Sequence, residues 1–181
     1  MVSTDGPANI CLVGLMGSGK STVAPLLADR LGREHIDLDK EIALRLGRTI
    51  MIIFADQGEE SFRREEQVVL QYFCNRDGLV IDCGGGVVLA AGNRSRLKDN
   101  FTVYLQTTPQ TLALRVGSAA GRPLLQGAEP IEDQLAALLS EREALYRECA
   151  AETITTDDRS PAEIADRIIA HLPASLKPLV P

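Results

Sequence analysis

The segment GLMGSGKST, residues 14–22, constrains this chain more than any other feature of the sequence. Gly14, Gly19, Lys20 and Ser21 satisfy the G-x-x-x-x-G-K-[ST] spacing of a phosphate-binding loop. The apolar run NICLV precedes the loop, and the segment VAPLLADRL after it has apolar residues at helical spacing. A loop between a strand and a helix directs backbone N–H groups and the positive end of the helix dipole at a phosphate. The alternative, a glycine-rich turn without a ligand, is disfavoured by the Lys-Ser pair.

Short apolar runs alternate with helical patterns along the rest of the chain. Five strands are predicted, at residues 9–13, 35–38, 78–83, 101–105 and 152–156. Helices are predicted at residues 20–31, 40–46, 50–56, 59–75, 109–117, 131–149 and 161–171. This alternation indicates an α/β fold with a five-stranded parallel sheet and helices on both faces. We expect one domain over residues 1–181, with a loose, proline-containing C-terminal tail at 173–181.

Composition excludes several classes of protein. The formal net charge is −6, which argues against a general nucleic-acid binder. No apolar run reaches membrane-spanning length, and no basic segment followed by an apolar stretch is visible near residue 1. The four cysteines lack metal-type or C-x-x-C spacing. We therefore expect a cytoplasmic protein with reduced thiols that contacts neither nucleic acid nor membrane.

Two aspartates lie where the second predicted strand gives way to a helix. Asp37 and Asp39 are two residues apart, so at strand spacing both carboxylates would face the same side. One could help to hold Mg²⁺, and the other could accept a proton from an attacking hydroxyl. The alternative is that Asp39 only caps the helix that follows.

Two further segments suggest a small acidic or hydroxylated ligand. In GEESFRREE, Arg63 and Glu66 are neighbours on one helix face, so the carboxylate could hold the guanidinium as a fork for a substrate carboxylate. The alternative is a solvated charged face. The triplet Gly84 to Gly86 follows a predicted strand and would present bare backbone to a flat ligand. The alternative is a tight turn, which rarely needs three glycines.

The chain resembles the shikimate kinases, small P-loop kinases related in fold to the nucleoside monophosphate kinases. The resemblance covers roughly residues 9–171. It is carried, in the family's order, by GLMGSGKST, DLDKEI, GRTI, IFADQGEESFRREE, GGG, GRPLL and EREALYRECA. It implies a P-loop kinase fold with a mobile lid at about residues 117–130 and an acceptor-binding region at about 34–62. It also implies transfer of phosphate from ATP to the 3-hydroxyl of shikimate, on the pathway to chorismate and the aromatic amino acids.

The resemblance also implies roles for individual residues. The nucleotide is bound by residues of the loop and by three arginines: Gly17, Ser18, Gly19, Lys20, Ser21, Thr22, Arg115, Arg122 and Arg159. Shikimate is bound by Asp39, Arg63, Gly84, Gly85, Gly86 and Arg142. Ser21 and Asp37 hold Mg²⁺, and the catalytic residues are Asp39, Lys20 and Arg122, with Arg122 reaching over from the lid. The expected partners are ATP and shikimate, and we expect a monomer.

Three rival functions remain open from the sequence. A gluconate kinase or a nucleoside monophosphate kinase would share the loop, although the GGG triplet with FRREE favours shikimate. A GTP-dependent switch protein would carry an N-K-x-D motif, which this sequence lacks. A non-catalytic binding module is disfavoured by Lys20, Asp39 and Arg122.

Overall fold

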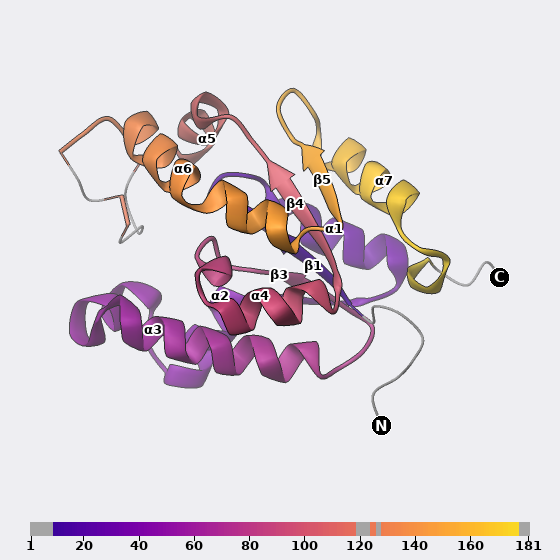
Figure 1. The fold of residues 1–181 in the computed structure, drawn as a ribbon, viewed down its shortest axis with the longest axis horizontal. Helices are drawn as coiled ribbons and strands as arrows, with labels where there is room; N and C mark the ends of the chain where they lie inside the picture. Colours follow the sequence, from indigo (N-terminus) through magenta and orange to yellow (C-terminus); the bar gives the residue numbers. More distant parts are fainter. Residues whose placement is uncertain (1–8, 119–123, 126–127, 178–181) are drawn as a thin grey trace.

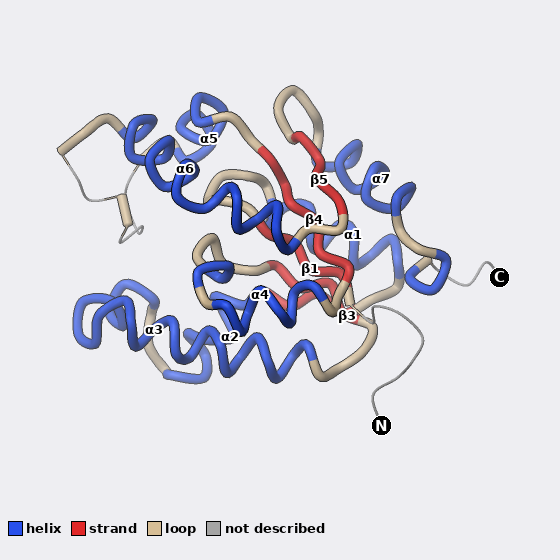
Figure 2. Tube along the Cα trace, viewed as in Figure 1, coloured by secondary structure: helices blue, strands red, loops and turns tan. Residues whose placement is uncertain are grey.

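The five predicted strands form one parallel sheet. The computed structural model describes residues 9–118, 124–125 and 128–177. The strands are β1 (Ile10–Val13), β2 (Glu34–Asp37), β3 (Leu79–Asp82), β4 (Phe101–Gln106) and β5 (Glu152–Thr155). Their order in the sheet is β2-β3-β1-β4-β5. The predicted α/β fold and parallel sheet are confirmed, with helices on both faces (Figures 1 and 2).

Two hydrophobic clusters divide the core between the faces of the sheet. The helices are α1 (Lys20–Leu31), α2 (Leu38–Leu46), α3 (Ile50–Cys74), α4 (Ala91–Lys98), α5 (Pro109–Val116), α6 (Ile131–Cys149) and α7 (Pro161–His171). On one face, α1 and α7 pack on Ile10, Leu12 and Val80. On the other, α3, α4 and α6 pack around Cys11 and Ile81. Because the central strands are buried on both faces, they read as continuous apolar runs.

The helical prediction for residues 50–75 is confirmed in its detail. The helix α3 runs from Ile50 to Cys74, but Gly58 within it has φ 76° and ψ 169°, which breaks the helical path. The predicted helices at 50–56 and 59–75 therefore meet at this glycine. The break separates the segment that starts at Ile50 from the helix that carries Arg63 and Glu66.

The structure differs from the sequence prediction in two places. The helix α4 and the short 3₁₀ turn before it (Val87–Leu89) were not predicted. Residues 173–177 are not loose: they form a second 3₁₀ turn (Ala174–Leu176), Leu176 packs into the core, and Arg33 donates to its carbonyl at 3.3 Å. The remaining tail residues, 178–181, lie outside the described part of the chain. Over the described residues, no helix combines the length and apolar character needed to cross a bilayer.

Candidate active site

The phosphate loop lies at the carboxyl end of the central strand β1, as the sequence predicts. Gly14 has φ 146°, and a Cβ there would lie 2.8 Å from the carbonyl oxygen of Leu105, so only glycine fits. The loop ends at Gly19, with φ 101°, and α1 begins at Lys20 without a side-chain cap. The first hydrogen bond at this end is donated by the Thr22 N–H to the carbonyl oxygen of Gly19 at 3.1 Å, so an anion can accept from the N–H groups of Lys20 and Ser21 before it. The Lys20 ammonium is buried and donates to the carbonyl oxygens of Gly14 at 2.9 Å and Leu15 at 3.2 Å.

A cavity of about 400 Å³ opens over this loop. Its lining brings together the phosphate loop, residues at or after the ends of β2 and β3, and one arginine of α5: Gly17, Gly19, Lys20, Ser21, Thr22, Asp37, Asp39, Asp82, Gly84, Gly85 and Arg115. The crevice lies where the strand order reverses on either side of β1, the usual ligand position in open α/β sheets. The predicted loop residues other than Ser18, which is buried, and both predicted aspartates thus line one space.

The two predicted aspartates have different surroundings. Asp37 ends β2 and is the cap of α2: its carboxylate accepts from the Lys40 backbone N–H at 3.1 Å and pairs with the Lys40 ammonium at 2.9 Å. Asp39 lies in the first turn of α2, so the prediction that the two aspartates share strand spacing was wrong. The alternative that Asp39 caps the helix was also wrong, because Asp37 is the cap. Burial, with the charges of Asp37 and Asp82, raises the pKa of Asp39 to about 6, against the lowering effect of Lys20 and Arg63.

A second cavity, of about 210 Å³, shares Met16, Asp39, Gly84 and Gly85 with the first. It is also lined by aromatic and aliphatic side chains, the last glycine of the triplet and two arginines: Ile50, Phe54, Phe62, Arg63, Gly86, Leu124 and Arg142. A ligand here would therefore lie between the arginines and the phosphate cavity, within reach of Asp39.

The two arginines in this cavity are held differently. The Arg63 guanidinium pairs with Glu59 at 2.8 Å and, as predicted, with the buried Glu66 at 2.9 Å, so the alternative of a solvated charged face does not apply to this pair. Burial raises the pKa of Glu66 to about 7, although Arg63 opposes this. Arg142 is only 3% exposed, and within the described residues its Nε and Nη1 have no hydrogen-bond partner. Buried guanidinium N–H groups without partners are costly, which indicates that an anion completes this site.

The glycine triplet makes room for these side chains. A Cβ on Gly84 would lie 2.7 Å from Oδ1 of Asp39, and one on Gly86 would overlap the guanidinium of Arg63. At Gly85 the nearest atom would be 3.5 Å away, so the middle glycine leaves open backbone toward the cavity. The alternative of a simple tight turn does not account for these contacts.

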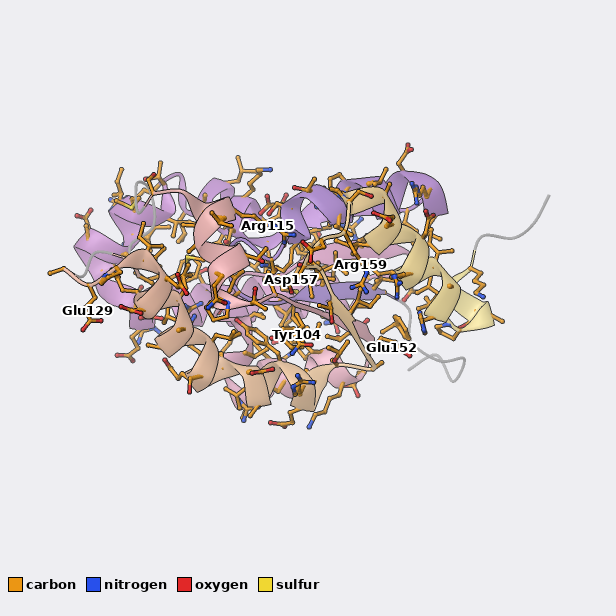
Figure 3. All side chains as sticks on the ribbon, turned by 90° about the horizontal axis from the view of Figure 1, so that it is seen from above. Tyr104, Arg115, Glu129, Glu152, Asp157 and Arg159 are labelled. Carbon is orange, nitrogen blue, oxygen red and sulfur yellow. The ribbon has the colours of Figure 1, made fainter. Side chains whose placement is uncertain are left out.

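The two arginines predicted to contact adenine each donate to a backbone carbonyl at the end of β5. Arg115, on α5, donates to the carbonyl oxygen of Thr156 at 2.8 Å and lines the larger cavity. Arg159, in the loop between β5 and α7, donates to the carbonyl oxygen of Thr155. Figure 3 labels both side chains, together with Asp157 of the same loop. Their predicted adenine contacts stay a prediction. Within the predicted lid, residues 119–123, which include Arg122, and residues 126–127 lie outside the described part of the chain.

Two residues of the site were missed from the sequence. Asp82 ends β3 and lines the larger cavity. Tyr146, on α6, donates from its hydroxyl to the carbonyl oxygen of Gly85 and stacks on Tyr104 with ring centroids 5.1 Å apart. Tyr146 therefore fixes the backbone of the glycine triplet. Neither residue belongs to a spacing pattern that would have marked it.

Comparison with known proteins decides the family. The family model described as shikimate kinase matches residues 16–173. The chain belongs to the shikimate kinase family. The shikimate kinase of Thermosynechococcus vestitus is 41% identical over 176 residues, covering 97% of this chain and 96% of that protein. The structure of the Acinetobacter baumannii shikimate kinase in complex with shikimate has a TM-score of 0.86 at 44% identity and 90% coverage of both chains.

The rival assignment to a gluconate kinase has a structural counterpart of its own. A gluconokinase from Sinorhizobium meliloti has a TM-score of 0.59 at 20% identity, covering 91% of this chain and 90% of that one. At that identity the likeness extends to the fold alone. Membership of the shikimate kinase family makes this chain an ATP-dependent kinase.

The closeness of Gly86 to Arg63 predicts that a side chain at position 86 weakens acceptor binding without destabilising the fold. In Gly86→Ala the new methyl group must displace the Arg63 guanidinium, which is the end of a flexible side chain. We expect the melting temperature to change little and the KM for the acceptor to rise by about tenfold, the loss of one charged contact of about 1.4 kcal/mol. Steady-state kinetics and thermal melting test this. The exposed Gly92→Ala in α4 is the matched control, and an unchanged acceptor KM in Gly86→Ala would contradict the argument.

Proposed function

We propose that this chain transfers the γ-phosphoryl group of ATP to the 3-hydroxyl of shikimate, giving shikimate 3-phosphate and ADP. The reaction belongs to the pathway toward chorismate and the aromatic amino acids. Family membership supports the assignment, as does the relative whose structure was solved in complex with shikimate. The structural observation that most supports this activity is the pair Arg63 and Arg142 in a cavity that shares Asp39 with the phosphate cavity.

The acceptor cavity has the chemistry that shikimate needs. Shikimate is a carboxylate with three hydroxyls on a ring. Arg142, with buried N–H groups that lack partners among the described residues, and Arg63, oriented by two glutamates, are suited to the carboxylate. Asp39 and the open backbone of Gly85 are suited to the hydroxyls, while Phe54 and Phe62 border the apolar side of the ring.

Asp39 is the group we propose to move the proton. Its carboxylate accepts the proton of the 3-hydroxyl while that oxygen forms its bond to the γ-phosphorus and the bond from the γ-phosphorus to the bridging oxygen of ADP breaks. A pKa of about 6 leaves Asp39 deprotonated at neutral pH, yet far more basic than an exposed aspartate. Lys20 and the amides of residues 17–22 hold the phosphate oxygens, and Arg115, which lines the cavity, and Arg159 contact the rest of the nucleotide.

The proposed metal cofactor is Mg²⁺. Among the described residues, no group of three or more His, Cys, Asp or Glu side chains forms a metal site by itself. The donors present fit an ion that shares its shell with water and phosphate oxygens: the Ser21 hydroxyl and the Asp37 carboxylate line the same cavity. Ser21 and Asp37 would hold the ion, and it would supply positive charge that offsets the charge of the phosphate oxygens. We also propose that the enzyme is monomeric. We further propose that it is cytoplasmic, which its four free cysteines support.

A coupled assay of ADP release tests the function. The purified protein is supplied with ATP and Mg²⁺ and, in separate reactions, with shikimate, quinate, gluconate or nucleoside monophosphates. We expect turnover that needs shikimate and Mg²⁺ together. Equal turnover with gluconate, or turnover only with a nucleotide acceptor, would replace the proposed substrate.

Arg142→Lys is expected to raise the KM for shikimate by about tenfold while the KM for ATP stays within about twofold. Lysine keeps the charge but lacks the planar fork that meets both oxygens of a carboxylate. Kinetics with each substrate varied in turn measure the two values. Binding of an analogue with the carboxylate reduced to an alcohol serves as the control. If the substitution weakens both ligands equally, Arg142 does not bind the carboxylate.

A further inference from the structure

The carbonyl groups of the glycine triplet are held in two different ways. Those of the first and last glycine accept from the backbone N–H groups of Val87 at 3.1 Å and Leu89 at 3.0 Å. The carbonyl oxygen of Gly85 accepts instead from the side-chain hydroxyl of Tyr146. A glycine between two other glycines has wide backbone freedom, so its orientation depends on the contacts that it makes. The middle peptide of the triplet is therefore oriented from α6 rather than by its own turn.

Gly85 lies where the two cavities meet the phosphate loop. It lines both cavities. A Cβ on Gly85 would lie 3.5 Å from the backbone nitrogen of Met16 and 3.6 Å from the carbonyl oxygen of Gly14, so its backbone packs against the loop. A rotation of this peptide would therefore move the border of the acceptor cavity relative to the loop that holds the phosphates.

The Tyr146 hydroxyl is held in place by a rigid, buried scaffold. Its ring is fully buried and stacks on Tyr104 of β4, labelled in Figure 3, with ring centroids 5.1 Å apart and 19° between the planes. Burial raises the pKa of both hydroxyls, so Tyr146 is a neutral donor at neutral pH. Arg142 lies one turn earlier on α6 and lines the acceptor cavity. One helix thus presents a charged group to the cavity and a donor to the Gly85 carbonyl.

We propose that Tyr146 is a positioning residue for the acceptor: its hydroxyl fixes the Gly85 peptide, and this peptide sets where the hydroxyl side of the acceptor lies relative to the phosphate loop. The inference rests on the proposed function in that the acceptor is a hydroxylated acid bound beside Gly85. Tyr146 is absent from the lining of both cavities, so it acts through the glycine backbone. Because Arg142 binds the carboxylate from the same helix, α6 fixes both ends of the acceptor.

The test is Tyr146→Phe, which keeps the stacked ring and removes the hydroxyl. The Gly85 carbonyl is then left without its donor, and we expect kcat/KM for the acceptor to fall by about tenfold or more. The KM for ATP should stay within about twofold, because the phosphate loop keeps its own contacts. Steady-state kinetics and thermal melting measure these quantities. Equal losses for both substrates, or a lower melting temperature with unchanged kinetics, would show a purely structural role and overturn the proposal.

The matched control is Tyr104→Phe. Among the described residues the buried Tyr104 hydroxyl has no hydrogen-bond partner, so this substitution removes the same group from the same stack and leaves Gly85 held. We expect the kinetic constants of this variant to stay within about twofold of those of the unmodified protein. The same acceptor defect in both variants would assign the effect to the stack and contradict the role of the Tyr146 hydroxyl.

A carboxylate-free ligand distinguishes action through Gly85 from action through Arg142. Titration calorimetry measures binding of the acceptor acid and of its analogue with the carboxylate reduced to an alcohol. Because Gly85 borders the hydroxyl side, Tyr146→Phe should weaken both ligands by the same factor. A loss confined to the acid would mean that Tyr146 acts on Arg142, and the proposal would be wrong.

NMR observes the Gly85 carbonyl directly and needs no acceptor. Residues 84–86 contain the only adjacent glycines of the sequence. Glycine labelled with ¹³C at the carbonyl and with ¹⁵N therefore gives carbonyl-to-nitrogen correlations from the triplet alone. In Tyr146→Phe the Gly85 carbonyl signal should move upfield, because the hydrogen bond to it is lost, and in Tyr104→Phe it should stay in place. An unmoved signal in Tyr146→Phe refutes the inference.

The same spectrum of the unmodified protein requires no substitution. Addition of the acceptor should shift the triplet correlations, and no shift at saturation would show that the acceptor does not meet Gly85, which also overturns the proposal. The acceptor used is the acid that gives turnover in the ADP-release assay. If that acid is not shikimate, the proposed function fails while this test still applies, so the two failures are distinguishable.

Discussion

Replacing Asp39 by asparagine is expected to lower kcat by about 10²–10⁴-fold, while the affinity for ATP stays within a few-fold. Asparagine keeps the shape of the side chain and can still hydrogen-bond a hydroxyl, but it cannot take up the proton. Asp39 borders both cavities, so it lies between the acceptor and the phosphate loop. Steady-state kinetics beside titration of an ATP analogue measure the two quantities. A variant that keeps most of its kcat at neutral pH would reduce Asp39 to an orienting group.

The pH dependence of kcat/KM in the unmodified enzyme tests independently whether Asp39 is the base. Asp39 acts as a base only when deprotonated, and its pKa is raised to about 6, so kcat/KM for shikimate should fall as pH falls through about 6. The pKa of Glu66 is raised to about 7, and its protonation weakens the hold on Arg63. Substitution of Glu66 distinguishes the two groups. In Glu66→Gln we expect kcat/KM still to fall as pH falls through about 6, whereas in Asp39→Asn this pH dependence should disappear.

Thermal melting separates a catalytic loss from a folding defect in Asp39→Asn. The folded-state pKa of Asp39 lies above the unfolded value of 3.8, so the charged carboxylate destabilises the folded state. This penalty is complete above about pH 6 and absent below about pH 4. The asparagine variant should therefore melt no lower than the unmodified protein at pH 7.5, and any gain should shrink toward pH 4. A variant that melts lower at pH 7.5 would point to a structural role.

The sheet could be predicted because its strands are buried on both faces. A strand such as Leu79–Asp82 has no solvent face, so it forms an apolar run that stands out between helical patterns. The phosphate loop was equally visible, because its glycines and its Lys-Ser pair must be close in sequence. In both cases the structural requirement falls on neighbouring residues.

The helix α4 was missed because tertiary hydrogen bonds stabilise it. Its sequence, AGNRSRLK, buries only Asn93 and Leu97 and shows no apolar stripe. The Asn93 amide donates to the carbonyl oxygen of Val87 at 3.0 Å, and Arg94 donates to the carbonyl oxygen of Val88 at 2.8 Å. Polar side chains therefore attach this helix to the turn that follows the glycine triplet, and periodicity cannot reveal such contacts.

The missed site residues show the same limit. Asp82 reaches the phosphate loop only because β3 lies between β2 and β1, and that order cannot be read from one strand. Tyr146 contacts a carbonyl 61 residues away in the chain. By contrast, Arg63 and Glu66 were predicted as a pair because three residues along a helix place them together. Site residues were predictable where their contacts are local, and otherwise only through the family resemblance.

Arg122→Ala is expected to lower kcat by at least about a hundredfold, equivalent to about 2.7 kcal/mol, with shikimate affinity changed only a few-fold. Arg122 lies outside the described residues, and the family resemblance implies its role. Leu125 is buried beside Leu15 and Leu112, and Leu124 lines the acceptor cavity. The chain therefore borders the acceptor cavity two residues after Arg122.

We expect kcat to fall without a matching loss of shikimate affinity because Arg122 would contact the phosphoryl group mainly in the transition state. Charge spreads over the equatorial phosphoryl oxygens in the transition state, and an arginine that meets them there is worth about 10³–10⁵-fold in some phosphoryl-transfer enzymes. Because the interaction is mainly absent in the ground state, its loss lowers kcat and leaves substrate binding almost unchanged. Steady-state kinetics beside direct shikimate titration test this, with the exposed Arg64→Ala on α3 as the control. A variant with near-normal kcat, or one that loses shikimate binding in proportion to rate, would show that Arg122 does not supply the catalytic charge.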